Sequence, residues 1–429
     1  MKTLIKNVHL TEKYGFGNDT VNILIDGEYI KYVGKEADFE GVERVIEGNG
    51  NLVIPGFYNA HCHSSMTLFR GYGDDLPLDT WLNTRIFPAE ENLNGERTYY
   101  GTMLAVAEML RGGIVSFSDM YMFMDSVAEA VNKTGIKANL ARSIVSFDKD
   151  IEMKDDFRTL ESIEFAKKWH GANGGRIMVD MSLHAEYTNV EKCARYVGEY
   201  AKENGLRMQF HLSETEKEHM ECIGRHGITP TEFFLRAGVL DVPSTAAHCV
   251  YLTENDMDIL AEKGTFVAHN PVSNLKLGSG IMPYSLMRAH GVNIALGTDG
   301  VASNNRLDMI RELQFAALIH KGNERNAAAT NARDIIDIAT VNGARSQGRD
   351  DCGEIKEGYR ADLVMIDMSA VNNIPVYNYE SALAYSVKTE DVCLTMIDGD
   401  ILYRDGEYTT IDMERLKFEF SDVVAHYFD

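Results

Sequence analysis

One recurring pattern constrains this chain most: a short apolar run that ends in a residue able to bind a metal ion. The run at residues 52–57 is followed by His61 and His63, and later runs end in His211, His248 and Asp299. Alternate side chains of an extended strand share a face, so the i, i+2 spacing directs both imidazoles of the first pair the same way. The pattern predicts a metal site where several strands end.

Between about residues 55 and 345, these β-type runs alternate with amphipathic helical stretches. Eight such β/α units predict an α/β fold of the TIM-type (β/α)8 barrel, whose active sites lie at the carboxyl ends of the strands. The expected strands end near His61, Asp119, Ser143, His184, His211, His248, Asn270 and Asp299. The metal-type residues therefore fall at the edge of the barrel where chemistry is expected.

Both ends of the chain carry short strand-like pieces separated by turn signals, for example at residues 21–30, 361–367 and 394–400. We expect these pieces to pair into one satellite sheet, within a small β-sandwich satellite domain formed by both chain ends. The predicted boundaries are 1–54 for the N-terminal part of the sandwich, 55–350 for the barrel, and 351–429 for the C-terminal part and tail.

Composition excludes several classes of function. The chain has 429 residues with 42 basic and 65 acidic side chains, and a net charge of -23 disfavours nucleic acid and anionic membrane surfaces as partners. Six scattered cysteines form no C-x-x-C pair, and no run approaches the roughly 20 apolar residues of a membrane span. We expect a soluble, cytoplasmic protein with free thiols.

The donor set indicates one divalent ion. Three neutral imidazoles, from His61, His63 and His211, with one Asp299 oxygen would leave an open position for water, as catalytic zinc requires. Zinc is the expected ion, with iron and manganese as alternatives. The fourth strand ends in His184 and not in the carboxylated lysine that bridges two ions in binuclear barrel hydrolases, which favours a mononuclear site.

Three residues are candidates for moving protons. Glu214 lies three positions after His211, just beyond the strand end, and is the predicted proton shuttle. His248 would orient or polarise the hydroxide formed at the metal. Asp299, close to metal and water, would take the water proton and later pass it to the leaving group.

Five segments carry a resemblance to a known family: PGFYNAHCH (55–63), RGYGDDLPL (70–78), HLSET (211–215), AHNPVSNLKL (268–277) and GTDGVASNN (297–305). From about residue 3 to 410 the chain resembles the amidohydrolase superfamily, and within it the S-adenosylhomocysteine/5'-methylthioadenosine deaminases. The resemblance implies that hydroxide attacks C6 of adenine, that Glu214 protonates N1 and binds the base with Asp299, and that ammonia leaves.

The same resemblance implies the substrate contacts. Trp81 would line the 5' side of the nucleoside, Glu90 would bind the ribose hydroxyls, and His184 would complete the pocket. Arg142 matches an arginine that contacts the amino-acid tail of S-adenosylhomocysteine.

The chain departs from the family pattern at two places. The second arginine of the tail site is not in its usual position, and Lys154 or Arg158 is the candidate replacement. The family's HAPYT segment reads HAEYT at residues 184–188, which is expected to add the Glu186 carboxylate beside the pocket. His219 and His226 lie in a charged stretch and are expected at the surface.

The leading prediction is a hydrolytic deaminase of adenosine-type nucleosides with a modified 5' position: S-adenosylhomocysteine, 5'-methylthioadenosine, 5'-deoxyadenosine or adenosine. The alternative is an aminohydrolase or chlorohydrolase of another aminated heterocycle, such as guanine, a pterin or an s-triazine. A non-catalytic assembly protein is the third hypothesis, although no ligand is missing. Family members often form dimers or tetramers, so a homo-oligomer is expected.

Overall fold

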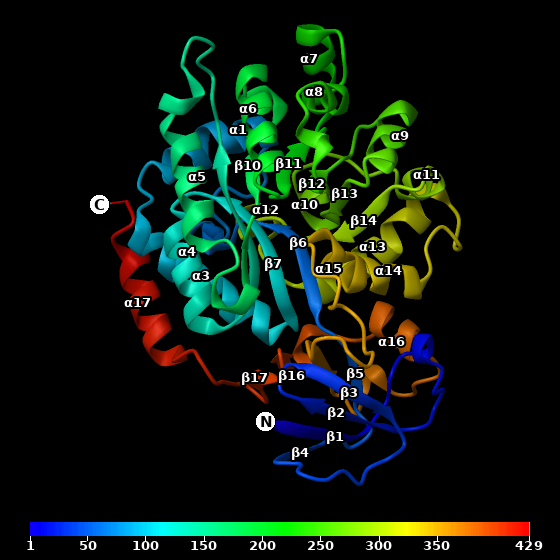
Figure 1. Ribbon diagram of the computed structural model, residues 1–429. Helices are drawn as coiled ribbons and strands as arrows, with labels where there is room; N and C mark the ends of the chain where they lie inside the picture. Colours follow the sequence, from blue (N-terminus) through cyan, green and yellow to red (C-terminus); the bar gives the residue numbers. More distant parts are fainter. Residues whose placement is uncertain (429) are drawn as a thin grey trace.

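A barrel of parallel strands forms the centre of the computed structural model, which describes residues 1–428 (Figure 1). The strands are paired in the order β14-β13-β12-β11-β10-β8-β7-β6, and β9 pairs with β8. Their bounds are β6 Phe57–Cys62, β7 Ile114–Tyr121, β8 Lys137–Ile144, β9 Ile177–Val179, β10 Met181–Leu183, β11 Met208–Leu212, β12 Ser244–His248, β13 Phe266–His269 and β14 Asn293–Leu296. Every residue of β7 and β8 is buried, as in parallel strands covered on both faces. The predicted barrel is confirmed.

The first and last barrel strands meet at the metal-type residues. The Asp299 amide, just after β14, donates a hydrogen bond of 2.9 Å to the His61 carbonyl in β6. Gly297 allows this approach, because a Cβ there would lie 3.0 Å from the His61 nitrogen and closer still to the Asn270 side chain. The barrel is therefore joined at the level where His61 and Asp299 leave their strands.

The helices that connect the strands lie outside the barrel (Figure 1). Their starts are specified by local sequence: Thr229 and Thr253 cap α8 and α9 in capping boxes, and Pro230 occupies the first turn of α8. The helices are α1 Leu78–Trp81, α2 Phe87–Glu90, α3 Gly95–Arg111, α4 Met124–Thr134, α5 Phe157–Trp169, α6 Glu191–Glu203, α7 Glu216–His226, α8 Pro230–Arg236, α9 Glu254–Glu262, α10 Pro271–Lys276, α11 Tyr284–Ala289, α12 Val301–Asn304, α13 Met309–Glu324, α14 Ala332–Ala339, α15 Val341–Ser346, α16 Tyr379–Tyr385 and α17 Met413–Ala425.

The satellite domain is the predicted sandwich, but the strand pieces that the sequence assigns to one sheet are divided between its two sheets. The first is built only from N-terminal strands, in the order β3-β2-β1-β4. The second has the order β18-β17-β16-β15-β5, so in this sheet β5 comes from the N-terminal part and pairs with β15. The bounds are β1 Lys2–Val8, β2 Val21–Asp26, β3 Tyr29–Gly34, β4 Arg44–Glu47, β5 Leu52–Pro55, β15 Leu363–Ile366, β16 Val392–Ile397, β17 Asp400–Arg404 and β18 Glu407–Tyr408. One apolar cluster, including Ile23 and Met396, fills the space between the sheets.

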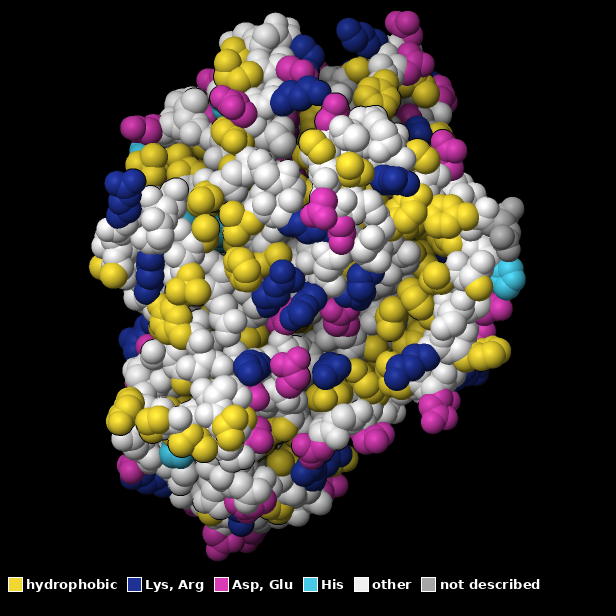
Figure 2. Space-filling view, turned by 180° about the vertical axis from the view of Figure 1, so that it is seen from behind, with side chains coloured by type: hydrophobic (Ala, Val, Ile, Leu, Met, Phe, Trp, Pro, Cys, Tyr) yellow, Lys and Arg dark blue, Asp and Glu magenta, His cyan; other side chains and the backbone are white. Residues whose placement is uncertain are grey.

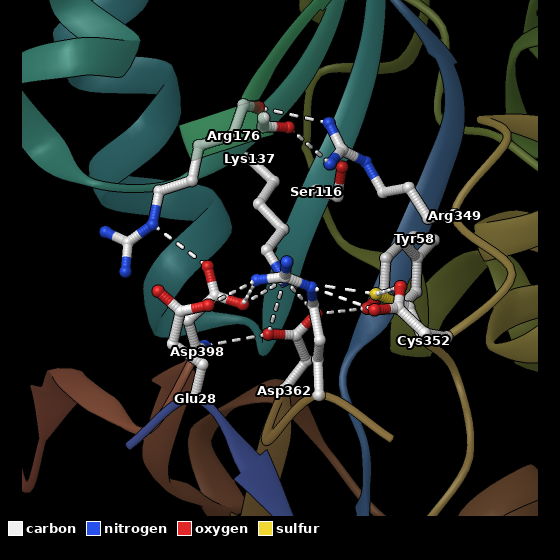
Figure 3. Close-up of polar contacts among 12 residues, drawn as sticks. Glu28, Tyr58, Ser116, Lys137, Arg176, Arg349, Cys352, Asp362 and Asp398 are labelled. Carbon is white, nitrogen blue, oxygen red and sulfur yellow. Dashed lines mark hydrogen bonds and ion pairs between the residues drawn. The ribbon is translucent and has the colours of Figure 1, made fainter. Parts of the chain in front are cut away.

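A buried ionic cluster joins the base of the barrel to this domain (Figure 3). Lys137, the first residue of β8, lies 2.6 Å from Asp362 and 2.7 Å from Asp398, both contributed by the satellite domain. Tyr58 donates to Asp362, and Arg176 lies 3.0 Å from Asp398. Burial opposes the charge of Lys137, but the Asp362 and Asp398 carboxylates raise its pKa above the ordinary value.

Helix α17 packs against α3 on the outside of the barrel (Figure 1). The face seen in Figure 2 carries basic and acidic side chains interspersed with apolar ones. Among the described residues, no helix combines the length and apolar character needed to cross a membrane.

Candidate metal centre and active site

Four predicted ligands from β6, β11 and the end of β14 converge at the carboxyl end of the barrel. The Nε2 atom of His63 lies 3.3 Å from Asp299 Oδ1 and 3.3 Å from His211 Nε2, and His61 Nε2 lies 3.5 Å from Asp299 Oδ1. These separations suit a small cation, because two ligands with bonds of 2.0–2.2 Å at tetrahedral angles are about 3.4 Å apart.

His61 supplies an independent test of the fit. Its Nε2 is buried and has no hydrogen-bond partner, an arrangement that is costly unless the atom binds something else. Burial lowers the pKa of the His61 imidazole to about 4, so the ring is neutral and its nitrogen has a free lone pair. The donor set and this orphaned atom fit a divalent ion.

Backbone carbonyls orient two of the imidazoles. The Nδ1 atoms of His63 and His211 donate to the carbonyls of Met120 and His184, each over 2.7 Å. A carbonyl can only accept, so the proton is on Nδ1 and the Nε2 lone pair faces the centre. The histidines are thus held in the tautomer that binds metal.

Asp299 is fixed by hydrogen bonds to both of its carboxylate oxygens. Ser273 and Ser303 donate to Oδ2 over 2.5 and 2.9 Å, and the Gly300 amide donates to Oδ1 over 2.8 Å. Burial opposes ionisation of Asp299, but the nearby imidazoles of His61, His248 and His63 hold the pKa of the carboxyl well below its usual range. Asp299 is therefore ionised as a ligand must be.

His248 and Glu214 face each other across the site. His248 Nδ1 donates to Asn274 Oδ1 over 2.8 Å, which leaves Nε2 directed inward, 3.9 Å from Glu214 Oε2. The ligand atoms of His61, His211 and His248 also lie within 4.8 Å of one another. His248 is thus close enough to act on a group bound at the centre.

Glu218, which the sequence patterns do not identify, holds the backbone of Glu214. Its two carboxylate oxygens accept the amide protons of Ser213 and Glu214 over 2.9 and 2.8 Å. Glu214 Oε1 accepts from Ser279, and burial raises the pKa of the Glu214 carboxyl above its ordinary value. Glu218 is four residues after Glu214 on α7, but sequence spacing alone cannot distinguish it from other acidic residues of that helix.

A cavity of about 1030 Å³ opens over this centre and is lined by the predicted substrate residues Trp81, Glu90, Arg142 and His184. Glu90 accepts a hydrogen bond from Tyr121 at the end of β7, a contact that the sequence does not foresee. Burial raises the pKa of Glu90 to about 7, partly offset by this hydrogen bond.

Arg142, the predicted contact for the amino-acid tail, is already engaged by protein groups. Arg142 Nε donates to Glu161 over 2.7 Å, and a second nitrogen donates to the Ser143 carbonyl. Arg158 lines the cavity and lies over the Phe157 ring, whereas Lys154 is not among the lining residues. Of the two candidate replacements for the second arginine, Arg158 is the one at the cavity.

Two expectations from the sequence are wrong. Glu186 does not line the cavity: its buried carboxylate lies 2.6 Å from Arg225 and 2.9 Å from His226, and it ties the short 3₁₀ turn Glu186–Thr188 to α7. His219 is buried and contacts Ser213, because α7 turns this face onto the strand end.

Comparisons with known proteins agree on one family. The model of the amidohydrolase family matches residues 52–402. A 5-methylthioadenosine/S-adenosylhomocysteine deaminase of Dictyoglomus thermophilum is 43% identical over 414 residues, covering 94% of this chain and 96% of the relative. A 5'-deoxyadenosine deaminase of Methanothermobacter thermautotrophicus is 41% identical over 404 residues, with 94% of each chain covered.

Solved structures share the fold over nearly the whole chain. An adenosine deaminase from Xanthomonas campestris with bound zinc is 31% identical, with a TM-score of 0.92 over 99% of this chain and 98% of the other. An atrazine chlorohydrolase from Arthrobacter aurescens with zinc is 22% identical, with a TM-score of 0.90 over 98% of this chain and the full length of the other.

Proposed function

Because the chain belongs to the amidohydrolase family, we propose that it is a metal-dependent hydrolytic deaminase of adenosine-type nucleosides with a modified 5' position. The products would be the corresponding inosine analogue and ammonia. One observation carries the proposal: the mostly buried carboxyl group of Glu214 lies beside a cluster of metal-type ligands, and both line a cavity of about 1030 Å³ that is large enough for a nucleoside. The names of relatives that are 37–43% identical support the same chemistry.

In this proposal His61, His63, His211 and Asp299 hold one ion, and the preferred ion is zinc. Three imidazoles and one carboxylate suit zinc, and zinc is present in the structure of the Xanthomonas relative. The ion, when bound, supplies Lewis acidity and brings the pKa of water toward neutrality.

The side chains of the chain then move the protons. Glu214, whose raised pKa favours the protonated form, donates to the ring nitrogen next to the carbon that is attacked. Asp299 accepts a proton from the attacking water and passes it to the amino group, which leaves as ammonia, while Glu214 takes back the proton that the new hydroxyl at the ring carbon loses. His248 Nε2, held by its bond to Asn274, stabilises the oxygen that forms at the ring carbon.

Two residues that line the cavity can contact the ribose and the 5' group of a nucleoside. Glu90 carries a carboxylate that can accept hydrogen bonds from ribose hydroxyls, and Trp81 offers a broad apolar surface toward the 5' side. A free base would leave the Glu90 side of the cavity without a partner, which favours a nucleoside over a bare heterocycle.

Ion pairs formed by three cations that line the cavity favour substrates with small, uncharged 5' groups. Arg142 is paired with Glu161, Arg225 with Glu186, and Lys217 lies 3.5 Å from Asp79. The carboxylate of an amino-acid tail would have to compete with these partners. We therefore expect 5'-methylthioadenosine and 5'-deoxyadenosine to be better substrates than S-adenosylhomocysteine.

The test is ammonia release by zinc-loaded protein from adenosine, 5'-deoxyadenosine, 5'-methylthioadenosine, S-adenosylhomocysteine, guanine and one aminotriazine. Turnover of the nucleosides with the highest kcat/KM for the uncharged 5' groups is the expected result. Activity confined to guanine or the triazine would overturn the substrate assignment, and a protein that binds no divalent ion would overturn the mechanism.

A further inference from the structure

One wall of the cavity is formed by three very short helical pieces. It consists of α1, the π-helical turn Leu82–Ile86 and α2, here called the cavity wall (residues 78–90), and it carries Trp81 and Glu90. Helical pieces of four or five residues are unstable in isolation, so their position depends on tertiary contacts. On the cavity side, the hydrogen bond from Tyr121 to Glu90 is one such contact.

On the outer side the wall is held by residues that follow α17. Tyr427 is buried, with 3% of its surface exposed, and its hydroxyl donates over 3.0 Å to the carbonyl of Ala89, the residue before Glu90. Its ring meets Phe69 edge to face with centroids 5.4 Å apart. Phe69 ends the short turn Ser64–Phe69 that follows His63, so Tyr427 touches both the wall and the metal-side turn.

Arg97 at the start of α3 contacts both Tyr427 and the residue before it, His426. Its guanidinium lies 4.6 Å from the centroid of the Tyr427 ring, and one of its nitrogens donates over 2.7 Å to the His426 carbonyl. Another nitrogen donates to the carbonyl of Asn92, two residues beyond α2. Arg97 therefore contacts both the residues after α17 and the segment that follows the cavity wall.

We infer that Tyr427 is a positioning residue for the substrate: its hydroxyl fixes the backbone at Ala89 and so places Glu90 and Trp81 against the nucleoside. The effect on substrate rests on the proposed function, whereas the effect on the wall does not. Removing the hydroxyl takes away one hydrogen bond to the Ala89 carbonyl and leaves the metal-type ligands and Glu214 in place.

Trp81 allows the wall to be observed directly, because the chain has two tryptophans. In a Trp169→Phe background, fluorescence quenching by acrylamide reports the accessibility of Trp81 alone. Tyr427→Phe is the test variant, since it keeps the ring packed on Phe69 and Arg97. Tyr408→Phe is the matched control, because the Tyr408 hydroxyl likewise donates to a backbone carbonyl, that of Ala107, over 2.9 Å.

For Tyr427→Phe we expect stronger quenching of Trp81 and a KM for 5'-deoxyadenosine raised about fivefold, the size of one net hydrogen bond. We expect kcat to change less than about twofold and the metal content to stay the same, because the catalytic groups are untouched. Tyr408→Phe should leave quenching and KM at the parent values.

Quenching equal in the two variants would overturn the inference whatever the kinetics show. Stronger quenching with an unchanged KM would overturn the role in substrate binding. If the parent enzyme deaminated none of the nucleosides, the proposed function would fail, but the quenching comparison needs no substrate and would still decide whether Tyr427 holds the wall.

Discussion

At the scale of single residues, Glu214 depends on a second carboxylate for its place. Its own amide and that of Ser213 donate to Glu218, so the backbone leaving β11 is held while the Glu214 side chain stays free to act. The ligand histidines are held in a similar way, through carbonyls of neighbouring strands. The reactive groups are therefore positioned by backbone contacts that vary little with side-chain motion.

Replacing Glu214 by glutamine tests the proton transfer. The amide keeps the size and the contact with Ser279 but cannot deliver a proton, so kcat for 5'-deoxyadenosine should fall by about 100- to 10,000-fold. Zinc content, measured by atomic emission, should equal that of the parent. Glu254→Gln at the exposed start of α9 is the control, and a Glu214→Gln enzyme with near-parent kcat would remove Glu214 from the mechanism.

Replacing Glu161 by glutamine tests the pairing that restrains Arg142. The freed guanidinium should accept a substrate carboxylate more readily, so the kcat/KM ratio of S-adenosylhomocysteine to 5'-deoxyadenosine should rise about threefold, as for a partly exposed ion pair. Glu164→Gln on the same helix, where the pair with Lys167 is exposed, is the matched control. An equal ratio in both variants would mean that Glu161 does not limit the tail site.

At the scale of elements, the strand ends could be predicted and the helix contacts could not. Parallel strands buried on both faces are encoded as apolar runs, so His211 and Asp299 were correctly assigned to strand ends from sequence alone. Glu186 and His219 were misplaced, because which face of α7 meets the barrel depends on long-range packing with Arg225 and Ser213. Tyr427 and Ala89 are in contact although most of the barrel sequence lies between them. No local sequence pattern predicts such a long-range pair.

Helix α13 carries a buried acid that makes stability depend on pH. Burial raises the pKa of Glu312 to about 8, although Asn304 and the Val272 amide donate hydrogen bonds to it. Because the folded state holds this proton more tightly than the unfolded state, Glu312 lowers stability progressively as pH rises from about 4.5 to about 8. Glu312→Gln does not titrate, so the stability of the parent relative to this variant should fall by up to about 1.4 kcal/mol per pH unit in that window.

Urea denaturation of both proteins at pH 5.5, 6.5 and 7.5 measures this difference. Glu324→Gln at the exposed end of the same helix is the control. A parent-to-variant difference that stays constant over the three pH values for Glu312→Gln would contradict the prediction.

At the scale of the whole molecule, the chemistry and the connection between domains lie at opposite ends of the barrel. The metal-type residues follow the carboxyl ends of the strands, whereas Lys137 begins β8 and meets Asp362 and Asp398 of the satellite domain at the other end (Figure 3). The sequence predicted that both chain ends form this domain. It predicted a sandwich but not how the strands divide between its two sheets, because the pairing of β5 with β15 joins residues that are far apart in the sequence, such as Pro55 and Leu363.

Lys137→Met should destabilise the protein by about 3–5 kcal/mol, because it leaves two buried carboxylates without their shared cation. Lys168→Met removes an exposed pair with Asp125 and should cost far less, because water and salt screen such a pair. Thermal unfolding of both variants, followed by circular dichroism, provides the comparison. Similar unfolding temperatures for the two would mean that the buried cluster contributes little to stability.

The seam between β6 and β14 has a consequence for how the protein is made. His61 and His63 leave the ribosome early, but Asp299 follows the last barrel strand, and the hydrogen bond from Asp299 to His61 closes the ring. A nascent chain therefore lacks a complete ligand set until its barrel sequence is fully synthesised. With the proposed ligand set, metal capture is a late event in biogenesis, open to finished barrels and not to truncated ones.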